Sequence, residues 1–435
     1  MRTKLVFIAM TALMLASCNK VADKVNEQED SVPEKEAVAV KELPVSYAPA
    51  GSFGTLSDAV KGILMKQWDF SFGLLSGMYE EGESLIVSPL SVQFALGMLY
   101  AGADGQTAAE IADVIGTGES MTKEAMLSYG KTVMEGLAGD DAVTARIANA
   151  LVVNSAQTSV KREYASNLLS NFYAPSIDAD FNEEADDIMK GVNNWSNKVT
   201  EGRIPLLLDR VNPEVAYYLF SSLYLKGEWN LPMVESTDNF IHANGDEETI
   251  PFLHTSDGIV GGSGFETLSY AQKEGYELVR RGLGRENYAF YVVLPTGSSL
   301  AAVLESVKEN PAAVFQDMKA GPVWMSMPAI SQKGDVDLKD VLGRLGIEKV
   351  FSSGSDLSQM FERNSKVGQI YQKSSFEVNV LGLEGASVTV VDGPCLSPEP
   401  GTEVPEPFFF IADHPFLYFV REETTGLILY IGVYE

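Results

Sequence analysis

Residues 376–413, FEVNVLGLEGASVTVVDGPCLSPEPGTEVPEPFFFIAD, combine two kinds of sequence that rarely adjoin in a compact domain. Phe376, Val378 and Val380 alternate with polar residues, which is the pattern of a half-buried strand. Residues 382–391 continue with β-compatible side chains, of which only Glu384 is charged. Residues 394–407 are rich in proline and glutamate, so they cannot pack into a core. We therefore predict a long exposed connection that begins with a segment able to become a strand.

Five blocks of the chain, taken in order, resemble the serpins, a large family of suicide protease inhibitors. The strongest is the C-terminal block FIADHPFLYFVREETTGLILYIGV, residues 410–433. The others are VSPLS with AGADGQTAAEI (residues 87–91 and 101–111), NNW with TEGRI (193–195 and 200–204), YLKGEW (224–229) and DLKDVLGRLGI (337–347). Together they span about residues 60–435, so the resemblance covers most of the chain.

The resemblance implies an α+β architecture, the serpin fold. It has three β-sheets, eight or nine helices and an exposed reactive-centre loop, which falls here at about residues 382–407. Local patterns also favour a mixed α+β fold over a doubly wound one, because helical patterns mostly come first and strand patterns mostly last. Strands are predicted over residues 215–225 and 288–294, and a turn between two apolar strands over residues 422–426.

Two helix starts are predicted from capping patterns. Ser88 is a good helix cap, and Pro89 suits the first position of the helix that follows. Thr107 and Glu110 have the spacing of a capping box for a short helix ending near Gly116.

The first 17 residues have the layout of a bacterial lipoprotein signal peptide. Arg2 and Lys4 precede an apolar run that is too short to span a membrane. The following Leu-Ala-Ser-Cys resembles the lipobox, in which the cysteine, here Cys18, is lipidated. An ordinary signal peptide that happens to contain a cysteine is the alternative. The expected location is outside the cytoplasm, on a lipid anchor in a bacterial membrane, at the outer membrane or cell surface; Asn19 leaves inner-membrane retention open.

Residues 18–55 are expected to form a flexible acidic tether, because their composition offers no usable hydrophobic periodicity. The serpin domain is then expected over residues 56–435. The formal charge of the whole chain is −28, and loss of residues 1–17 with Arg2 and Lys4 would bring it to −30. This charge argues against nucleic acid and anionic polysaccharides as partners. The sequence shows no basic helix of the heparin-binding kind, and a monomer is expected.

Nothing in the sequence predicts chemistry of the protein's own. The chain has three histidines and no Gly-x-Ser-x-Gly elbow. Asp413 and His414 are adjacent, but sequence neighbours seldom place a carboxylate on an imidazole, so no triad is expected. No metal spacing or cofactor motif is present. Cys395 lies in the predicted loop without a base beside it, and lipidation of Cys18 would leave it without a disulfide partner.

The resemblance implies a mechanism in which the loop is cleaved as a substrate and then inserts into the central sheet as a new strand. The hinge of that movement would be Gly382, Leu383, Glu384, Gly385, Ala386 and Ser387. If Glu384 faces solvent, alternation along the strand turns Leu383, Gly385 and Ser387 toward the core, and all three are uncharged. Leu383 is bulkier than the Thr or Ser usual in the family, and Val380 and Leu381 replace two acidic residues.

The region of the sheet that must open is assigned by resemblance to seven residues: Ser88, Pro89, Ser91, Ser221, Lys226, Trp229 and Gln372. Ser221 and Gln372 stand where the family usually has Asn and His. Both side chains can hydrogen-bond, so we expect them to form a substitute pair.

At the family's usual distance from the hinge glycine, the reactive bond falls at Leu396-Ser397, with Cys395-Leu396 as the alternative. Leucine suits the apolar pocket of chymotrypsin-like or cathepsin-G-like serine proteases, and cysteine the small pocket of elastase-like ones. Trypsin-like targets are excluded, because residues 377–415 contain no Lys or Arg. The protease could be of host or bacterial origin. The competing interpretation is a serpin that no longer inhibits and acts as a binding protein or a plain substrate.

The lipid anchor predicts the behaviour of one variant. Cys18→Ser should remain unlipidated and should move from the detergent phase to the aqueous phase in Triton X-114 partitioning. Unchanged partitioning would contradict the assignment of Cys18.

Overall fold

The computed structural model describes residues 40–256, 265–363, 365–367, 370–383 and 406–435. Eight α-helices lie in these ranges: α1 (Asp58–Met78), α2 (Pro89–Gly102), α3 (Gly105–Ile115), α4 (Lys123–Leu137), α5 (Arg162–Asn171), α6 (Ala185–Val199), α7 (Leu300–Glu309) and α8 (Lys339–Leu345). The strands are β1 (Leu85–Val87), β2 (Val143–Asn154), β3 (Ser176–Ala179), β4 (Tyr217–Glu228), β5 (Val234–Ile241), β6 (Glu247–His254), β7 (Glu266–Lys273), β8 (Tyr276–Leu283), β9 (Tyr288–Pro295), β10 (Lys319–Pro328), β11 (Ile330–Asp337), β12 (Tyr371–Asn379), β13 (Gly382–Leu383), β14 (Phe408–Ile411), β15 (Phe416–Glu422) and β16 (Ile428–Tyr434). The predicted α+β fold is confirmed.

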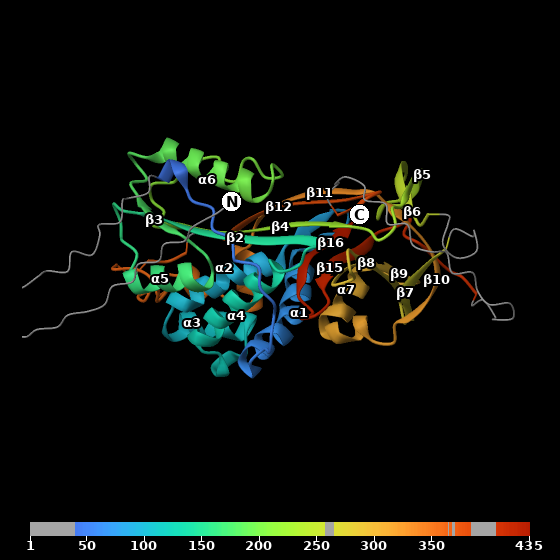
Figure 1. Ribbon diagram of the computed structural model, residues 1–435, viewed down its shortest axis with the longest axis horizontal. Helices are drawn as coiled ribbons and strands as arrows, with labels where there is room; N and C mark the ends of the chain where they lie inside the picture. Colours follow the sequence, from blue (N-terminus) through green and yellow to red (C-terminus); the bar gives the residue numbers. More distant parts are fainter. Residues whose placement is uncertain (1–39, 257–264, 364, 368–369, 384–405) are drawn as a thin grey trace, which may run out of the picture. The chain divides into compact units, whose positions relative to one another are not determined.

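A six-stranded sheet, in the order β11-β12-β13-β4-β2-β3, forms the centre of the fold (Figure 1). Its two faces bury different cores, as the alternation of side chains along β2 shows. Ile147, Leu151 and Val153 join the larger core with the helices α1–α4. Ala148, Ala150 and Val152 face α6 and pack with its Ile188, Val192 and Trp195. The sheet is therefore covered on both sides, by α1–α4 on one face and by α6 with its neighbouring segments on the other.

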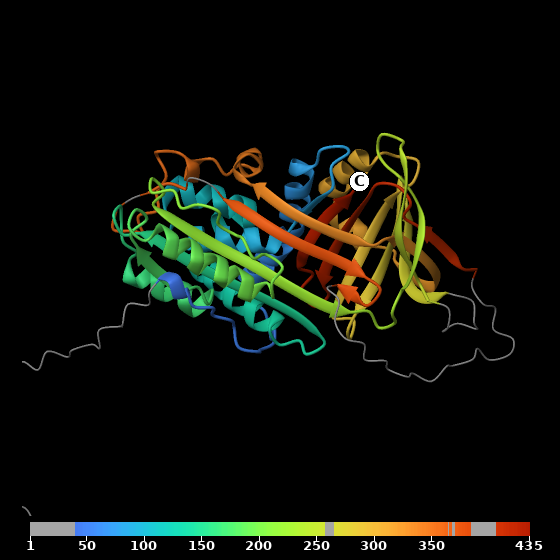
Figure 2. The same cartoon turned by 90° about the horizontal axis from the view of Figure 1, so that it is seen from above.

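The other strands form a ten-stranded network, β1-β16-β15-β9-β8-β7-β10-β6-β5, with β14 beside β10. The three sheets predicted from the resemblance are thus two hydrogen-bonded networks among the described residues. The reason is β10, which pairs with β7 through residues 319–323 and with β6 through residues 326–328. It therefore joins what would otherwise be two sheets. The strands of this network lie toward the right of Figure 2.

The helix caps agree with the sequence in one case and differ in the other. Ser88 caps α2 by accepting a hydrogen bond from Ser91 N, and Pro89 is the first helical residue. The capping box at Thr107 and Glu110 is wrong, because α3 begins earlier, after its cap Asp104. Thr107 Oγ1 instead accepts from Asp356 N at 2.9 Å, and Glu110 accepts from the amides of residues 348 and 349. Both side chains are used in tertiary contacts.

The compact body begins before the expected boundary at residue 56. Val40 and Leu43 are buried in the core beneath α6. Gly51 N donates to Glu135 O at 3.0 Å, and Phe53 packs against the main core. Residues 40–55 therefore belong to the body and not to the tether, because their few apolar side chains find partners far along the chain.

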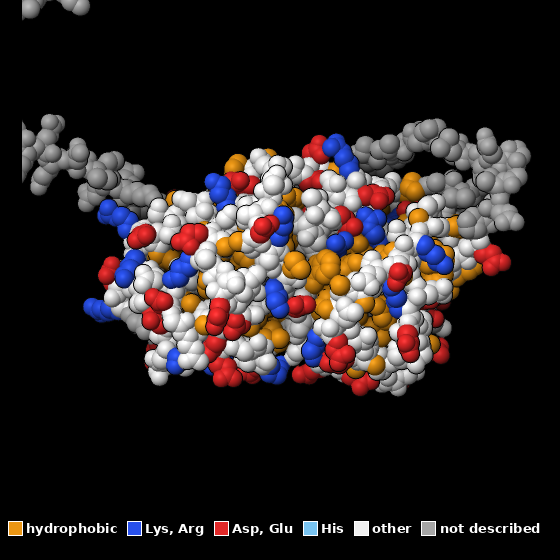
Figure 3. Space-filling view, turned by 90° about the horizontal axis from the view of Figure 1, so that it is seen from below, with side chains coloured by type: hydrophobic (Ala, Val, Ile, Leu, Met, Phe, Trp, Pro, Cys, Tyr) orange, Lys and Arg blue, Asp and Glu red, His pale blue; other side chains and the backbone are white. Residues whose placement is uncertain are grey.

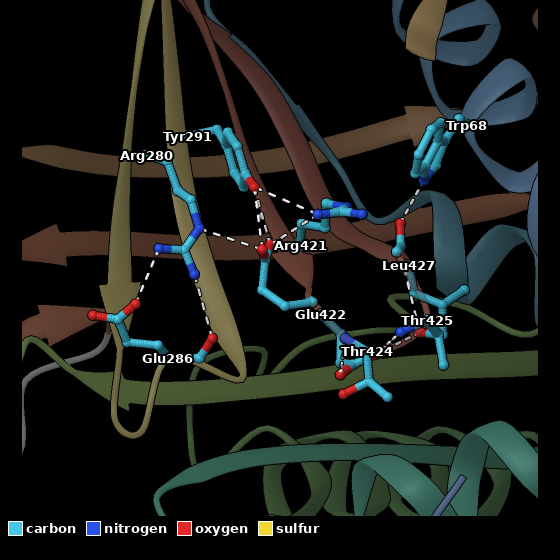
Figure 4. Close-up of polar contacts among 11 residues, drawn as sticks. Trp68, Arg280, Glu286, Tyr291, Arg421, Glu422, Thr424, Thr425 and Leu427 are labelled. Atoms are coloured by element: carbon cyan, nitrogen blue, oxygen red, sulfur yellow. Dashed lines mark hydrogen bonds and ion pairs between the residues drawn. The ribbon is translucent and has the colours of Figure 1, made fainter. Parts of the chain in front are cut away.

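The predicted turn at residues 422–426 closes the hairpin of β15 and β16 (Figure 4). The buried Glu422 carboxylate accepts hydrogen bonds from the backbone amides of Thr424 and Thr425, at 2.8 and 2.7 Å. Beside it, Arg421 lies over the rings of Trp68 and Phe315, at 5.3 and 4.5 Å from the ring centroids. These contacts tie the C-terminal hairpin to α1 and to the segment after α7.

The same turn carries a second carboxylate, which contacts side chains of the neighbouring strands (Figure 4). Glu423 accepts from Arg421, Arg280 and the Tyr291 hydroxyl, at 3.1, 3.3 and 3.1 Å. Burial, followed by the nearby Glu423 charge, raises the pKa of Tyr291 to about 12. Tyr291 is therefore neutral at physiological pH and can donate this hydrogen bond.

Seen from below Figure 1, the molecule carries acidic and basic side chains interspersed, with apolar side chains gathered near the centre of that face (Figure 3). Among the described residues, no helix is long and apolar enough to cross a membrane.

The close packing of residues 40–43 on α6 predicts the effect of a small substitution. A Cβ at Gly191 would lie 2.0 Å from Val40 O. Gly191→Ala should therefore push the segment off α6 and destabilise the protein by about 1–3 kcal/mol. Limited proteolysis within residues 40–55 and a thermal melt would measure both effects.

Gly343→Ala in α8 is the matched control, since a Cβ there has no neighbour within 4 Å. Helix propensity alone should make it stabilising, by about 0.5–1 kcal/mol. Equal effects of the two substitutions would contradict the proposed contact.

Candidate functional site

The segment after β12 turns back into the six-stranded sheet and forms the two-residue strand β13. Gly382 and Leu383 pair antiparallel with Asn379 and Val378 of β12, and on their other side with Glu228 and Gly227 of β4. The turn is fixed by two backbone amides that follow β4. Trp229 N donates to Leu381 O at 2.9 Å, and Met233 N donates to Val380 O at 2.8 Å. The start of the predicted loop is therefore already a strand between β4 and β12.

Gly382 is required at this entry point for two reasons. Its φ is 151°, within the region that favours glycine. A Cβ there would also lie 2.1 Å from Gly227 O. Only glycine lets the hinge approach β4 this closely.

Leu383 points into the core and is 1% exposed. It lies opposite Val378, which is equally buried, and on the same face as Phe376. The bulk of its side chain is thus accommodated at the mouth of the site. Glu384, Gly385, Ala386 and Ser387 lie outside the described residues.

Beyond Leu383, no backbone pairing joins β4 to β12 in the part of the chain that the structure describes. A pocket opens there, and we call it the slot. It is lined by apolar side chains from both strands and from β16, including Leu223, Leu225, Phe376, Leu383 and Tyr430. Residues 218–222 of β4, which continue along the slot, are only partly buried although they belong to an inner strand.

An ion pair lies at the rim of the slot. Arg203 Nη1 donates to Glu377 Oε2 at 2.6 Å, and each side chain is 35% exposed. Partial burial opposes ionisation of Glu377, but hydrogen bonds from Asn379 and Arg203 outweigh it and hold the pKa of Glu377 below its usual value. Local sequence patterns give no sign of this pair, because its two residues are 174 positions apart.

The residues predicted to control sheet opening come together in part. Ser88, Ser91 and Gln372 are buried at the start of α2. Gln372 Oε1 accepts from Ser88 N, and Gln372 Nε2 donates to Ser88 O, both at 2.9 Å. Ser88 Oγ donates to Leu429 O at 2.8 Å, which adds β16 to the cluster. Gln372 therefore joins β12 to the first turn of α2, next to Pro89.

The expected pair between Ser221 and Gln372 is not formed. Ser221 Oγ is buried and has no hydrogen-bond partner among the described residues. Gln372 is bonded to Ser88 through both amide atoms, and its Oε1 also accepts from Ser374 Oγ at 3.2 Å. Lys226 is half-buried on β4, opposite Thr144. Trp229 is buried at the mouth of the slot, where its Nε1 donates to Asn379 O at 3.0 Å.

The sequence expectation for Asp413 and His414 is wrong in one respect. The two side chains do meet, with His414 Nδ1 at 2.8 Å from Asp413 Oδ1. The other ring nitrogen, Nε2, lies 2.9 Å from Pro295 O. Both sides of the imidazole are thus in hydrogen-bond contact with acceptors, which fits a structural role. Among the described residues, no group of three or more side chains is placed to hold a metal ion.

The predicted reactive bond and lipidation site lie outside the described residues, which exclude Cys18, Cys395, Leu396 and Ser397. They remain predictions from the sequence.

Comparison with known proteins agrees with this architecture. The family described as Serpin (serine protease inhibitor) matches residues 65–435. Serpin-Z2A of Triticum aestivum is 27% identical over 401 residues, covering 87% of this chain and 97% of the relative. Iripin-2 of Ixodes ricinus is 29% identical over 359 residues, covering 80% and 87%. The chain belongs to the serpin family.

Solved structures show the same fold. The native state of the thermophilic serpin tengpin aligns with a TM-score of 0.76 and 20% identity, covering 90% of this chain and 99% of that one. Thyroxine-binding globulin in complex with thyroxine aligns with a TM-score of 0.72 and 19% identity, covering 86% and 98%.

The bridge between Gln372 and Ser88 predicts a stability effect. Gln372→Met keeps the side chain's length but leaves Ser88 N and O buried without their partner. It should lower the melting temperature of the uncut protein, with a free-energy cost of about 1–3 kcal/mol. Ser221→Ala is the control and should have little effect, because Ser221 Oγ makes no hydrogen bond in the described structure. A larger loss for Ser221→Ala would overturn this assignment.

Proposed function

We propose that this protein is a suicide-substrate inhibitor of serine proteases with chymotrypsin-, cathepsin-G- or elastase-like specificity. The observation that supports this most directly is β13, a strand of two residues that enters between β4 and β12 where the slot continues. The sheet thus already holds the first two residues of the loop, and the unpaired parts of β4 and β12 beyond them could pair with further loop residues.

The chemistry belongs to the protease. Its serine Oγ attacks the carbonyl carbon of Leu396, the bond to Ser397 N breaks, and the new amine takes the proton delivered by the protease's histidine. Leu396 is then an ester on the enzyme. Cleavage at Cys395-Leu396 is the alternative and would suit an elastase-like pocket.

Insertion would follow the register that β13 has begun. Each further loop residue would pair one position earlier on both β4 and β12, which extends the existing antiparallel ladders. About ten new backbone hydrogen bonds, at roughly 0.5–1.5 kcal/mol each, would give on the order of ten kcal/mol. That equals the stability of an ordinary domain, so the uncut form would be a kinetic trap. The acyl-enzyme would be carried along the sheet before it can hydrolyse.

The proposed location is outside the cytoplasm, on a lipid anchor at Cys18 in a bacterial membrane, at the outer membrane or cell surface. The support is the sequence of residues 1–18. The serine protease met there could come from a host or from bacteria.

A non-inhibitory serpin, acting as a binding protein or plain substrate, is the second candidate. It is favoured by Val380 and Leu381, which replace the acidic residues usual before the hinge, and by Ser221 Oγ, which lacks a partner among the described residues. The buried position of Leu383 supports inhibition, because a branched side chain already fits at the entrance.

The deciding experiment mixes the protein with chymotrypsin, cathepsin G and elastase and resolves the products by SDS gel. A covalent complex that survives SDS supports inhibition, and cleavage without a complex supports the second candidate. N-terminal sequencing of the small fragment locates the bond. A start at Ser397 identifies Leu396-Ser397, and a start at Leu396 identifies the alternative.

The direction of Leu383 predicts how a charge there would act. Because Leu383 is already buried in the uncut protein, Leu383→Arg would place a cation without a partner in the sheet both before and after cleavage, at a cost of several kcal/mol. The hinge should therefore leave the sheet, so that the uncut variant melts below the parent and the inserted strand loses its starting point. The variant should be cut at the same bond yet fail to trap the protease. Cleavage should raise the melting temperature of the parent protein sharply, and that of the variant much less.

Glu384→Arg is the matched control, since the next residue of an inserted strand would face solvent. It should retain trapping. Trapping by Leu383→Arg, or its loss in Glu384→Arg alone, would show that the assignment of faces is reversed.

A further inference from the structure

Residues 200–208, which follow α6, cross the outer face of the six-stranded sheet, on the side that α6 covers (Figure 1). We call them the strap. Hydrogen bonds fold the strap back onto α6. Ser196 Oγ donates to Ile204 O at 2.7 Å, Ile204 N donates to Thr200 Oγ1 at 2.9 Å, and Asn193 Oδ1 accepts from the amides of residues 207 and 208 at 2.8 Å. The strap and α6 therefore move as one unit.

The strap is bonded to the sheet on both sides of the slot. On the β4 side, Glu201 accepts from the Tyr224 hydroxyl at 2.9 Å and from Arg146 of β2 at 3.3 Å. On the β12 side, Arg203 donates to Glu377 at 2.6 Å, and Lys373 Nζ donates to Leu206 O at 3.1 Å. Glu377 and Lys373 are four residues apart on one strand, so both project from the same face.

This arrangement links two strands that have no backbone pairing with each other beyond β13, within the described residues. Any widening of the slot between β4 and β12 must stretch the strap or break its bonds to one strand. The strap's bonds to β12 consist of one ion pair and one charged hydrogen bond, both at least partly exposed, and neither of them involves α6 or β4. They are the point at which the strap would release.

We propose that Arg203 and Glu377 are positioning residues that set the rate at which the slot opens for loop insertion, and thereby the fraction of cleaved molecules that trap the protease. The proposal rests on the proposed inhibitory function. The ion pair exists in the closed sheet and is absent from the opened transition state. Its removal therefore raises the energy of the closed form only and speeds opening.

The direction of the effect follows from the competition after cleavage. The acyl-enzyme either hydrolyses, which releases active protease, or is carried away by insertion. Faster opening favours insertion, so fewer inhibitor molecules are consumed per protease trapped. The same change makes the uncut protein convert sooner, on warming, to a form with an inserted loop.

The test uses Glu377→Gln, which removes the charge and keeps an oxygen for the hydrogen bond from Asn379 Nδ2. With chymotrypsin, cathepsin G or elastase, whichever forms the complex, the rate of insertion should rise by up to about fivefold and the stoichiometry of inhibition should fall. Asp141→Asn is the control, because the Asp141–Arg285 ion pair at 2.9 Å does not border the slot; it is more exposed to solvent than the Arg203–Glu377 pair.

The charge-reversed pair separates a specific contact from general damage. Arg203→Glu and Glu377→Arg should each act like Glu377→Gln, and the double variant should return the insertion rate toward the parent value. An unchanged stoichiometry in Glu377→Gln, or no rescue in the double variant, would overturn the proposal.

Hydrogen exchange keeps the proposal testable if the protein traps no protease. Glu377→Gln should speed amide exchange in the uncut protein within residues 371–379 and 200–208, and the double charge reversal should slow it again. Faster exchange without any covalent complex would support the effect of the strap on slot opening and refute the inhibitory function. Covalent complex formation with unchanged exchange and unchanged stoichiometry would refute the strap alone.

Discussion

The entry of two residues between β4 and β12 is the constraint on which the rest of the structure depends. Gly382 can pass Gly227 O only because Gly382 carries no side chain. Once it has passed, Leu383 is buried opposite Val378. The sheet is thereby held apart at one end, and the slot continues from that point. Because β13 has only two residues, the rest of β4 and β12 can still pair with residues that follow it in the chain.

The surrounding contacts fix this unfinished state. Trp229 and Met233 hold the turn before Gly382 through the carbonyls of Leu381 and Val380. Gln372 ties β12 to the start of α2, and Ser88 ties that helix to β16. These groups are mostly neutral and buried, where an unmade hydrogen bond is expensive. The frame around the slot is rigid, whereas the strap across it relies on partly exposed charges.

Sequence patterns predicted the features that depend on near neighbours. The cap at Ser88, the turn at residues 422–426 and the end of β12 at residues 376–379 follow from local side-chain preferences. Val380 was expected to continue that strand but lies in the turn that follows it. The patterns failed where a side chain had two possible uses. Thr107 and Glu110 have the spacing of a capping box, but tertiary partners took both. The buried residues Val40 and Leu43 were assigned to a tether, because two apolar residues in a polar segment give no periodic signal.

The slot could be anticipated only through its hinge. The alternation of Phe376, Val378 and Val380 with polar residues, and the uncharged residues after Glu384, predicted a segment that could join a sheet. The pairing of Gln372 with Ser88 in place of Ser221, and of Arg203 with Glu377, depends on how distant strands and loops meet. Neither residue type nor spacing encodes such a meeting. The described residues also end at Leu383 on this side of the loop, so the predicted reactive bond stays a statement about sequence.

The free energies involved show that the slot and the strap affect different properties of the protein. Completing a ladder along β4 and β12 is worth on the order of ten kcal/mol, and a partly exposed ion pair about 0.2–1 kcal/mol. The strap therefore cannot determine which state of the sheet is more stable. It can change the height of the barrier between the two states, because its bonds to β12 must break before the strands separate. A weak contact across the slot therefore changes the rate at which the slot opens and leaves the stability of the final state almost unchanged. That rate matters for inhibition, because loop insertion competes with hydrolysis of the acyl-enzyme.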